Sequence, residues 1–365
     1  MSEEFMEQLS IARGLSYGLE KVKLCENLIT AAQKLGNTEL EYKARCELLE
    51  AVVFSNQQTK VLPTFAWIIA EQDRNPDKHG MLMFLWYYKW VIVKLPKFTS
   101  IPRERIMAVA DDMQKRYATS GYGLGPFHHC MKNLHLSMGE LDLADKHFEL
   151  QRQQGGSFLD DCKACMINDD VYYEHWKGNP QASIDAADDL LTGKQSCKEV
   201  PLATYPIIMH ALTSLSRHEK AIPYYKRFIK EKEDEKSYLL EYKYLLIYLA
   251  ITQNYTEARE AFIDQYPYVN LHASDSEIFH FLIGALIYMK ALMSSNISSI
   301  TLPAQLVIEL PHQDYEYQVS DLMIFFEQRV DAIGVAFNER NGNKHYDSYK
   351  VKALDMIKLS KKVKL

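Results

Sequence analysis

Apolar residues recur at three- and four-residue spacing through most of the chain, which is the period of an amphipathic helix. Runs that alternate strictly between apolar and polar residues, which would predict strands, are hard to find. Glycine and proline, which interrupt helices, number only 15 and 12 in 365 residues. The pattern therefore predicts an all-α fold with more than about two-thirds of residues in helices and essentially no sheet. The predicted helices cover residues 3–13, 17–35, 38–55, 58–73, 79–94, 102–117, 124–138, 140–153, 159–177, 180–192, 202–216, 218–232, 236–252, 255–266, 275–293, 317–339 and 345–361.

Four segments of the chain can be superimposed as helix-turn-helix units. They read MGELDLADKHF (138–148), KGNPQASIDAA (177–187), LSRHEKAIPYY (215–225) and TQNYTEAREAF (252–262). In each segment a small residue lies five positions after the turn residue. Another packing residue lies four positions, or about one helical turn, after the small residue. The small residue lets two helices approach closely, and the later side chain fills the gap to a neighbouring hairpin. The turn residues are Gly139, Gly178, Ser216 and Gln253, the small residues are Ala144, Ser183, Ala221 and Ala258, and the later residues are Phe148, Ala187, Tyr225 and Phe262.

This pattern resembles the tetratricopeptide repeat (TPR) over residues 36–266. Successive turns are separated by 39, 38 and 37 residues, whereas the family repeat has about 34, so the helices are expected to be longer. The chain also departs from the family seven residues before each turn, where a small residue is usual. The resemblance implies a right-handed α-solenoid with a concave inner face. We expect residues 1–35 to form N-terminal capping helices and residues 267–365 a C-terminal helical and capping region, with a long proline-containing connection at 300–318.

The resemblance also implies which residues face the concave groove, because the family's inward positions on each first helix can be transferred to this sequence. Asn133 and Asn168 are the main candidates, since an amide both donates and accepts hydrogen bonds and can hold an extended peptide backbone. We expect both amides to be hydrated before a peptide binds. Any of these side chains could instead bridge helices. The predicted peptide- or partner-binding residues are Tyr88, His129, Asn133, Asn168, Tyr172, His175, His210 and Lys243.

The long hairpins and the inward asparagines are also similar, in architecture only, to bacterial and phage peptide-pheromone receptors. Those receptors usually carry an additional DNA-binding or effector-binding helical domain, and residues 1–35 are too few for either. A non-catalytic protein- or peptide-binding scaffold is therefore the predicted function, and a regulatory peptide receptor is the alternative.

Composition and charge narrow the possible partners. Hydrophobic residues make up 47% of the chain and charged residues 25%, which suffices for a folded core. The net charge of -6 argues against nucleic acid as a partner. The N-terminal sequence has no signal-peptide pattern, and the apolar stretches 81–95 and 278–293 are interrupted by Lys or His, so we expect buried helices and no membrane span. Six cysteines without a disulfide framework favour a cytoplasmic location. The basic terminal sequence KLSKKVKL is interpreted as a solvated helix end.

One group of residues could ligate a metal ion. His128, His129 and Cys130, with Cys162 and Cys165, offer imidazole and thiolate ligands. A helical metal-dependent enzyme is the alternative that this group suggests. No second ligand pair completes a known zinc pattern, and cysteines three residues apart are common as apolar packing in helices. We therefore interpret these cysteines as packing residues and expect no metal, no cofactor and no catalytic site.

Overall fold

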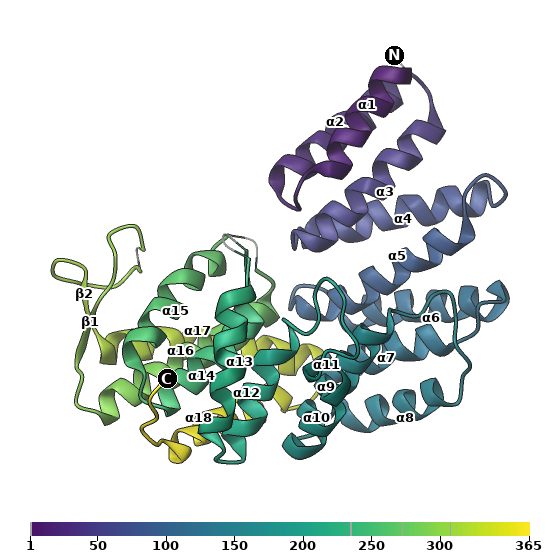
Figure 1. Cartoon of the computed structure of the whole chain (residues 1–365). Helices are drawn as coiled ribbons and strands as arrows, with labels where there is room; N and C mark the ends of the chain where they lie inside the picture. The colour runs from purple at the N-terminus through teal and green to yellow at the C-terminus, as the bar shows by residue number, and fades with distance from the viewer. Residues whose placement is uncertain (1, 234–235, 272, 307) are drawn as a thin grey trace. The chain divides into compact units, whose positions relative to one another are not determined.

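The computed structural model describes residues 2–233, 236–271, 273–306 and 308–365, and its fold is all-α (Figure 1). Helices contain 72% of the residues, which confirms the predicted helical content. Strands β1 (Ser299–Thr301) and β2 (Glu316–Gln318) pair antiparallel within the predicted connection. In the residues that the structure describes, this short ribbon is what the prediction of essentially no sheet misses.

Contacts within the chain define two compact units. The first contains Met1–Leu134 and Asp142–Asp160, and the second contains His135–Leu141 and Asp161–Leu365. The domain boundaries expected from the sequence, at 35 and 266, lie inside these units. The helices up to α8 are α1 (Ser2–Gly14), α2 (Leu19–Lys34), α3 (Thr38–Phe54), α4 (Gln58–Arg74), α5 (Met81–Lys94), η1 (Leu95–Lys97), α6 (Arg103–Ser120), α7 (Gly125–Met138) and α8 (Leu141–Arg152). They are followed by α9 (Lys163–Trp176), α10 (Pro180–Ala186), α11 (Asp188–Leu191), α12 (Thr204–Ser214), α13 (His218–Glu231), α14 (Leu239–Ile251), α15 (Tyr255–Val269), α16 (Asp275–Ser294), α17 (Val319–Asn341), α18 (His345–Asp355) and η2 (Met356–Leu359).

The four aligned turns share one backbone geometry. Gly139, Gly178, Ser216 and Gln253 all have positive φ, between 57° and 77°. At each turn the N–H of the following residue donates to the carbonyl oxygen five residues earlier, at 2.8–2.9 Å. A residue in the left-handed conformation followed by such a bond forms a Schellman motif at the C-terminus of a helix. This motif supplies hydrogen-bond donors for the last carbonyl groups of the helix. The turns identified in the sequence are therefore helix ends of one structural type.

The small residues of the alignment lie at close helix contacts. Ala144, Ser183, Ala221 and Ala258 are all fully buried. The hydroxyl of Ser183 donates to the carbonyl oxygen of Val171, 3.0 Å away on the other helix of the hairpin, which satisfies a buried polar group. In the second unit α12 packs on α14 and α14 packs on α16, while in the first unit α3 packs on α5. First helices of successive hairpins are thus neighbours inside each unit.

The core of the second unit is built around α16. This helix is long and apolar enough to cross a membrane by length and composition alone, but 78% of its apolar window is buried inside the protein. Its capping box at Ser274 and Glu277 fixes where it begins. Buried side chains of α14, α16 and α17 belong to one continuous hydrophobic cluster. We therefore describe α16 as a core helix.

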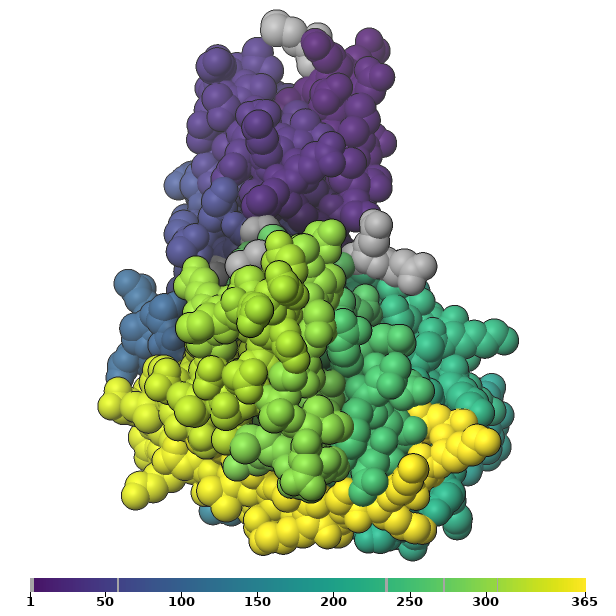
Figure 2. Space-filling view, turned by 90° about the vertical axis from the view of Figure 1, so that its left-hand side faces the viewer, coloured from purple at the N-terminus to yellow at the C-terminus, as the bar shows by residue number. Residues whose placement is uncertain are grey.

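The C-terminal sequence differs from its prediction. The predicted helix 345–361 stops at Asp355, and the chain continues through η2 to an extended end. The N–H groups of Lys361 and Val363 donate to the carbonyl oxygens of Ile251 and Thr252 at 2.9 and 3.1 Å. The C-terminal segment, yellow in Figure 2, runs along the surface of the second unit. The interpretation of KLSKKVKL as a solvated helix end is therefore wrong, because backbone bonds and the buried side chain of Val363 hold it against the turn after α14.

Candidate functional site

An apolar cleft lies between α4 and α6 in the first unit, with α5 beneath it. Its volume is about 710 Å³, within the range of roughly 300–1,000 Å³ that is typical of ligand pockets. Because α4 and α6 are second helices of successive hairpins, this α4–α6 cleft differs from the first-helix groove expected from the sequence. The α4 wall includes Leu62, Pro63, Ala66 and Ile69, the α6 wall Arg105, Ala108, Val109 and Asp112, and the floor Phe65 and Tyr88.

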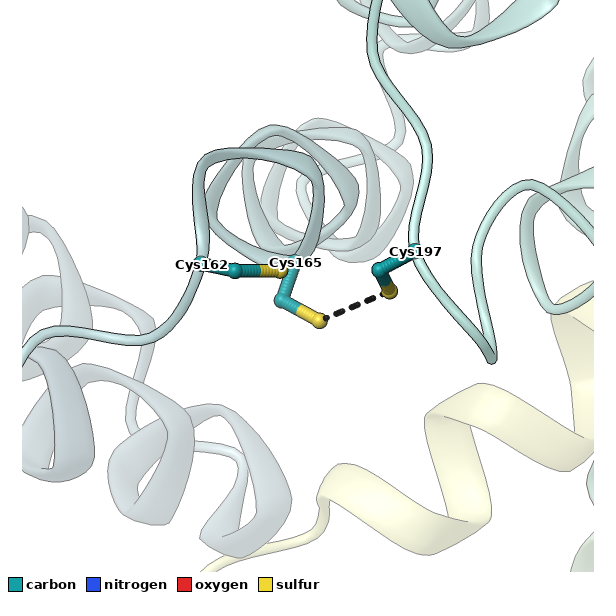
Figure 3. Close-up of side chains that lie close together, drawn as sticks. All are labelled: Cys162, Cys165 and Cys197. Atoms are coloured by element: carbon teal, nitrogen blue, oxygen red, sulfur yellow. Dashed lines mark hydrogen bonds between the residues drawn. The ribbon is translucent and has the colours of Figure 1, made fainter.

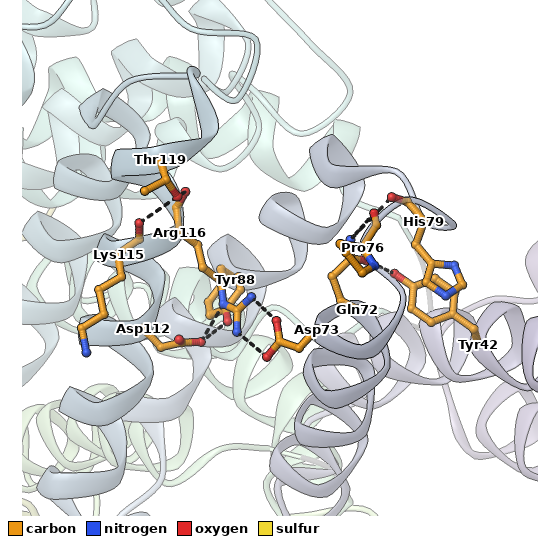
Figure 4. A network of polar contacts seen from close by, with 10 residues as sticks. All are labelled: Tyr42, Gln72, Asp73, Pro76, His79, Tyr88, Asp112, Lys115, Arg116 and Thr119. Atoms are coloured by element: carbon orange, nitrogen blue, oxygen red, sulfur yellow. Dashed lines mark hydrogen bonds and ion pairs between the residues drawn. The ribbon is translucent and has the colours of Figure 1, made fainter.

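A polar network closes one end of the cleft (Figure 4). One turn beyond the lining residues, the guanidinium of Arg116 donates two hydrogen bonds to the carboxylate of Asp73, at 2.7 and 2.9 Å. Its Nε also donates to Asp112, at 3.0 Å, and the hydroxyl of Tyr88 donates to the same carboxylate. The Arg116 bonds hold the pKa of Asp73 below its usual range, and burial raises the pKa of Tyr88. A bidentate pair of this kind fixes geometry as well as charge, so it joins α4 to α6 at this end.

The walls of the cleft present apolar groups to solvent. Ala66 and Ala108 are exposed on opposite helices, while Leu62 and Val109 are half-buried. Arg105 is exposed at the cleft, and its guanidinium has no hydrogen-bond or ion-pair partner among the described residues. The cleft can therefore take apolar side chains between its small-residue walls and place an acidic group near Arg105.

Three of the eight predicted binding residues lie in the first unit. Tyr88 forms part of the cleft floor, with its ring edge-on to Phe65 at a centroid distance of 4.7 Å. His129 is buried, and its Nδ1 lies 3.2 Å from the amide nitrogen of Gln151. Asn133 is half-buried, with its amide nitrogen 3.4 Å from Nε2 of His129. Of these three, only Tyr88 lines the cleft.

Three other predicted residues come together in the second unit, and we call them, with Tyr244 and Tyr349, the inner cluster. His175, His210 and Lys243 come from α9, α12 and α14. The rings of the two histidines are 4.9 Å apart, and the hydroxyl of Tyr244 lies 3.0 Å from Nε2 of His175. Burial lowers the pKa of His175, and it lowers that of His210 to about 3. The three side chains, which come from three successive first helices, therefore lie together in the second unit.

Lys243 is the most unusual member of the inner cluster. Only 2% of it is exposed, and burial lowers its pKa to about 7, against the attraction of Glu241. Its Nζ donates to the hydroxyl of Tyr349 on α18 at 2.8 Å and lies 3.9 Å from the ring centroid of Tyr244. Helix α18, which lies in the predicted C-terminal capping region, thus covers Lys243, a predicted binding residue.

The remaining two predicted residues lie beside this cluster on α9. Tyr172 is half-buried and packs against the core of the second unit. Asn168 is 8% exposed, and its amide oxygen accepts a hydrogen bond of 2.6 Å from the hydroxyl of Thr204. The expectation of a hydrated amide at Asn168 is therefore wrong, because α12 covers it.

Replacing Asn168 by alanine should lower the free energy of unfolding by about 1–2 kcal/mol, because the buried Thr204 hydroxyl loses its acceptor. Urea denaturation of Asn168→Ala, Thr204→Val and the double variant would measure the coupling between the two side chains. The double variant should lose less than the sum of the two single losses. Strictly additive losses would mean that the two side chains do not interact.

The residues of the predicted metal group belong to both units, and in the second unit the structure adds a residue to them. In the first unit, Nδ1 of His128 lies 3.0 Å from Nδ1 of His147. In the second unit, Cys162 and Cys165 lie with Cys197, which sequence reasoning missed. Cys162 and Cys197 both precede first helices of successive hairpins, so the repeat pattern held a signal that they lie close. We call Cys162, Cys165 and Cys197 the three-thiol cluster.

Comparisons with known proteins assign no family to the chain, since no protein-family model and no curated protein matches it. The candidate sites are therefore defined by the chain's own residues. In the first unit the candidate is the α4–α6 cleft, and in the second unit the candidates are the inner cluster and the three-thiol cluster.

Proposed function

We propose that this chain is a non-catalytic protein- or peptide-binding scaffold built from stacked TPR-like hairpins. We further propose that a partner segment binds in the α4–α6 cleft. The observation that carries the proposal is an apolar cleft of about 710 Å³ whose walls are exposed and half-buried side chains at helical spacing. Such walls suit the apolar anchors of a peptide that packs its side chains between two helices.

The composition of the cleft favours binding over catalysis. Its described lining residues include no His, Cys or Lys, which are frequent acids, bases and nucleophiles in enzymes. Its carboxylate, Asp112, already accepts hydrogen bonds from Arg116 and Tyr88. Arg105 remains available for a charge on the partner. We infer that the partner segment carries apolar residues at helical spacing and an acidic residue at one end.

The proposed setting is the cytoplasm. The six cysteines are free thiols, which suits a reducing compartment. The net charge of -6 supports a protein partner over nucleic acid. We propose that the chain acts in this setting as an adaptor that holds a partner protein.

Selection of a displayed random peptide library on the immobilised full-length protein tests the binding site. Enriched peptides should carry spaced apolar residues and an acidic residue. In fluorescence anisotropy, Ala66→Arg and Ala108→Arg should each weaken their binding by roughly tenfold to a hundredfold, because a long cation then occupies the cleft. Both alanines are exposed, so folding should change little.

Ala70→Arg is the matched control, since Ala70 is exposed on α4 but does not line the cleft. Its affinity should stay within about twofold of the wild-type protein, as is usual for a surface substitution away from the site. Unchanged affinity of both cleft variants would exclude this cleft as the binding site. Failure to enrich any peptide would argue against the scaffold function itself.

A further inference from the structure

Three cysteine side chains converge at the start of α9 (Figure 3). The sulfur atoms of Cys162, Cys165 and Cys197 all lie within 4.8 Å of one another. Those of Cys165 and Cys197 are 3.6 Å apart. These residues are 32 positions apart in the chain, so the fold itself brings them together.

Local structure explains this convergence. Cys162 is the N-cap residue of α9, and Cys165 lies one turn into the helix. Cys197 lies in the segment between α11 and α12, where its N–H donates to the carbonyl oxygen of Val200 at 2.9 Å. Cys165 and Cys197 pack against a small apolar cluster that contains Ala164 and Val200. Packing therefore holds two of the sulfur atoms, while Cys162 is exposed.

We propose that Cys162, Cys165 and Cys197 bind one zinc ion as three thiolate ligands, with the fourth tetrahedral position open to water or an external ligand. Zinc–sulfur bonds of about 2.3 Å at tetrahedral angles place neighbouring sulfur atoms about 3.8 Å apart. The 3.6 Å separation of Cys165 and Cys197 already matches this value. Moving the exposed Cys162 side chain by roughly 1 Å completes the triangle required by the metal.

Neighbouring groups shift the pKa values of two thiols of the cluster in opposite directions. Burial acts to raise the pKa of Cys162, but backbone N–H groups at the start of α9 and the neighbouring thiols hold it below its usual value. Burial and the two neighbouring sulfurs raise the pKa of Cys165. One thiolate is thus favoured, and further thiolates repel one another unless a positive charge lies between them. A divalent ion supplies that charge and releases the remaining thiol protons.

A disulfide is the competing chemistry for two of these residues. A disulfide bond joins two sulfur atoms at about 2.05 Å. It would not explain why a third sulfur atom lies beside them. Three sulfur atoms with metal-like spacing at a helix N-terminus fit an ion better. The ion would join the start of α9 to the segment that leads into α12, and so tie together two successive hairpins of the second unit.

Metal titration of the reduced full-length protein, purified without a metal-affinity tag, tests this site. Co²⁺ should produce sulfur-to-cobalt charge-transfer absorption that saturates at one ion per chain, and Zn²⁺ should displace it. Zinc at about a hundredfold excess over its dissociation constant should raise Tm by roughly 5–10 °C. Zinc-edge X-ray absorption of the wild-type protein should count three sulfur ligands at about 2.3 Å.

Cys162→Ser and Cys197→Ser should each abolish the charge-transfer band and the rise in Tm. Cys46→Ser is the matched control, because Cys46 is half-buried like Cys197 but lies in the first unit. This variant should bind zinc normally. The number of sulfur ligands measured by X-ray absorption of the wild-type protein tests the proposal even if a serine variant fails to fold. Fewer than three sulfur ligands, no metal uptake by the reduced protein, or a Cys165–Cys197 disulfide as the only product would overturn the proposal.

Discussion

Replacing Gly139 by alanine should destabilise the second unit by about 3–5 kcal/mol, the range of the largest single-residue effects. Gly139 has a φ of 74°, and a left-handed conformation costs roughly 1–2 kcal/mol for a residue with a Cβ atom. The larger part of the effect is steric. A Cβ atom at this position would lie only 2.2 Å from Cβ of His345, at the start of α18. Because Cβ is fixed to the backbone, α18 itself must move.

The movement would break the contacts that fix α18. Asn341 and Asn343 donate from their amide nitrogens to the carbonyl oxygen of Met138, at 3.2 and 2.8 Å. The hydroxyl of Tyr346 donates to the carbonyl oxygen of Ser137 at 3.1 Å. These donors are buried or partly buried, so separation from their acceptors is costly. A shift of α18 would therefore remove several hydrogen bonds at once.

Gly178→Ala is the matched control for this effect. Gly178 occupies the equivalent turn with a φ of 77°, but no atom lies within 4 Å of where its Cβ would be. Its loss should be limited to the backbone cost of about 1–2 kcal/mol. Urea denaturation of both variants, followed by circular dichroism, measures the difference. Equal losses would show that the α18 contact does not determine the stability of this turn.

Gly139 also marks what the sequence could and could not predict about the fold. Its position at a hairpin turn could be predicted from the sequence, because turn residues and the spacing of small residues are local patterns. The contact between Gly139 and His345 could not be predicted from the sequence, because it joins positions about two hundred residues apart and depends on where α18 packs. Periodicity likewise predicted helix 345–361 but not its end at Asp355, because tertiary hydrogen bonds hold the extended terminus.

The same distinction applies to the candidate sites. The spacing puts His175, His210 and Lys243 on first helices, and these three side chains lie together in the second unit. It could not predict that α18 covers Lys243, since a repeat pattern carries no information about non-repeat helices. The α4–α6 cleft could not be predicted in this way, because the transferred positions lie on first helices whereas Ala66 and Ala108 lie on the second helices α4 and α6.

Replacing Lys243 by methionine should increase the free energy of unfolding at pH 7 by on the order of 1–3 kcal/mol, although it removes a polar contact. In the folded protein the pKa of Lys243 is about 7, whereas an unfolded chain has a value near 10.4. Protonating the buried amine is therefore costly. Methionine has a similar length, keeps the packing against the ring of Tyr244, and carries no charge. The lost bond to the Tyr349 hydroxyl offsets part of the gain.

The sign of the pH dependence separates this effect from a simple packing change. Between pH 7 and about 10, Lys243 is protonated in the unfolded chain but largely deprotonated in the folded protein. The contribution of Lys243 to the free energy of unfolding of the wild-type protein therefore rises with pH. The slope approaches about 1.4 kcal/mol per pH unit. The methionine variant lacks this rise, so its advantage over the wild-type protein should shrink between pH 7 and 9.

Urea denaturation at pH 7, 8 and 9 measures this difference. Lys226→Met is the control, because Lys226 is exposed on α13 and its replacement should leave the pH dependence of the wild-type protein unchanged. A Lys243→Met variant that is less stable at pH 7, with an unaltered pH slope, would mean that Lys243 is a stabilising charged group. The expected result would instead identify Lys243 as a residue that the fold retains at a cost to its stability. Such a cost is typical of residues at binding and catalytic sites.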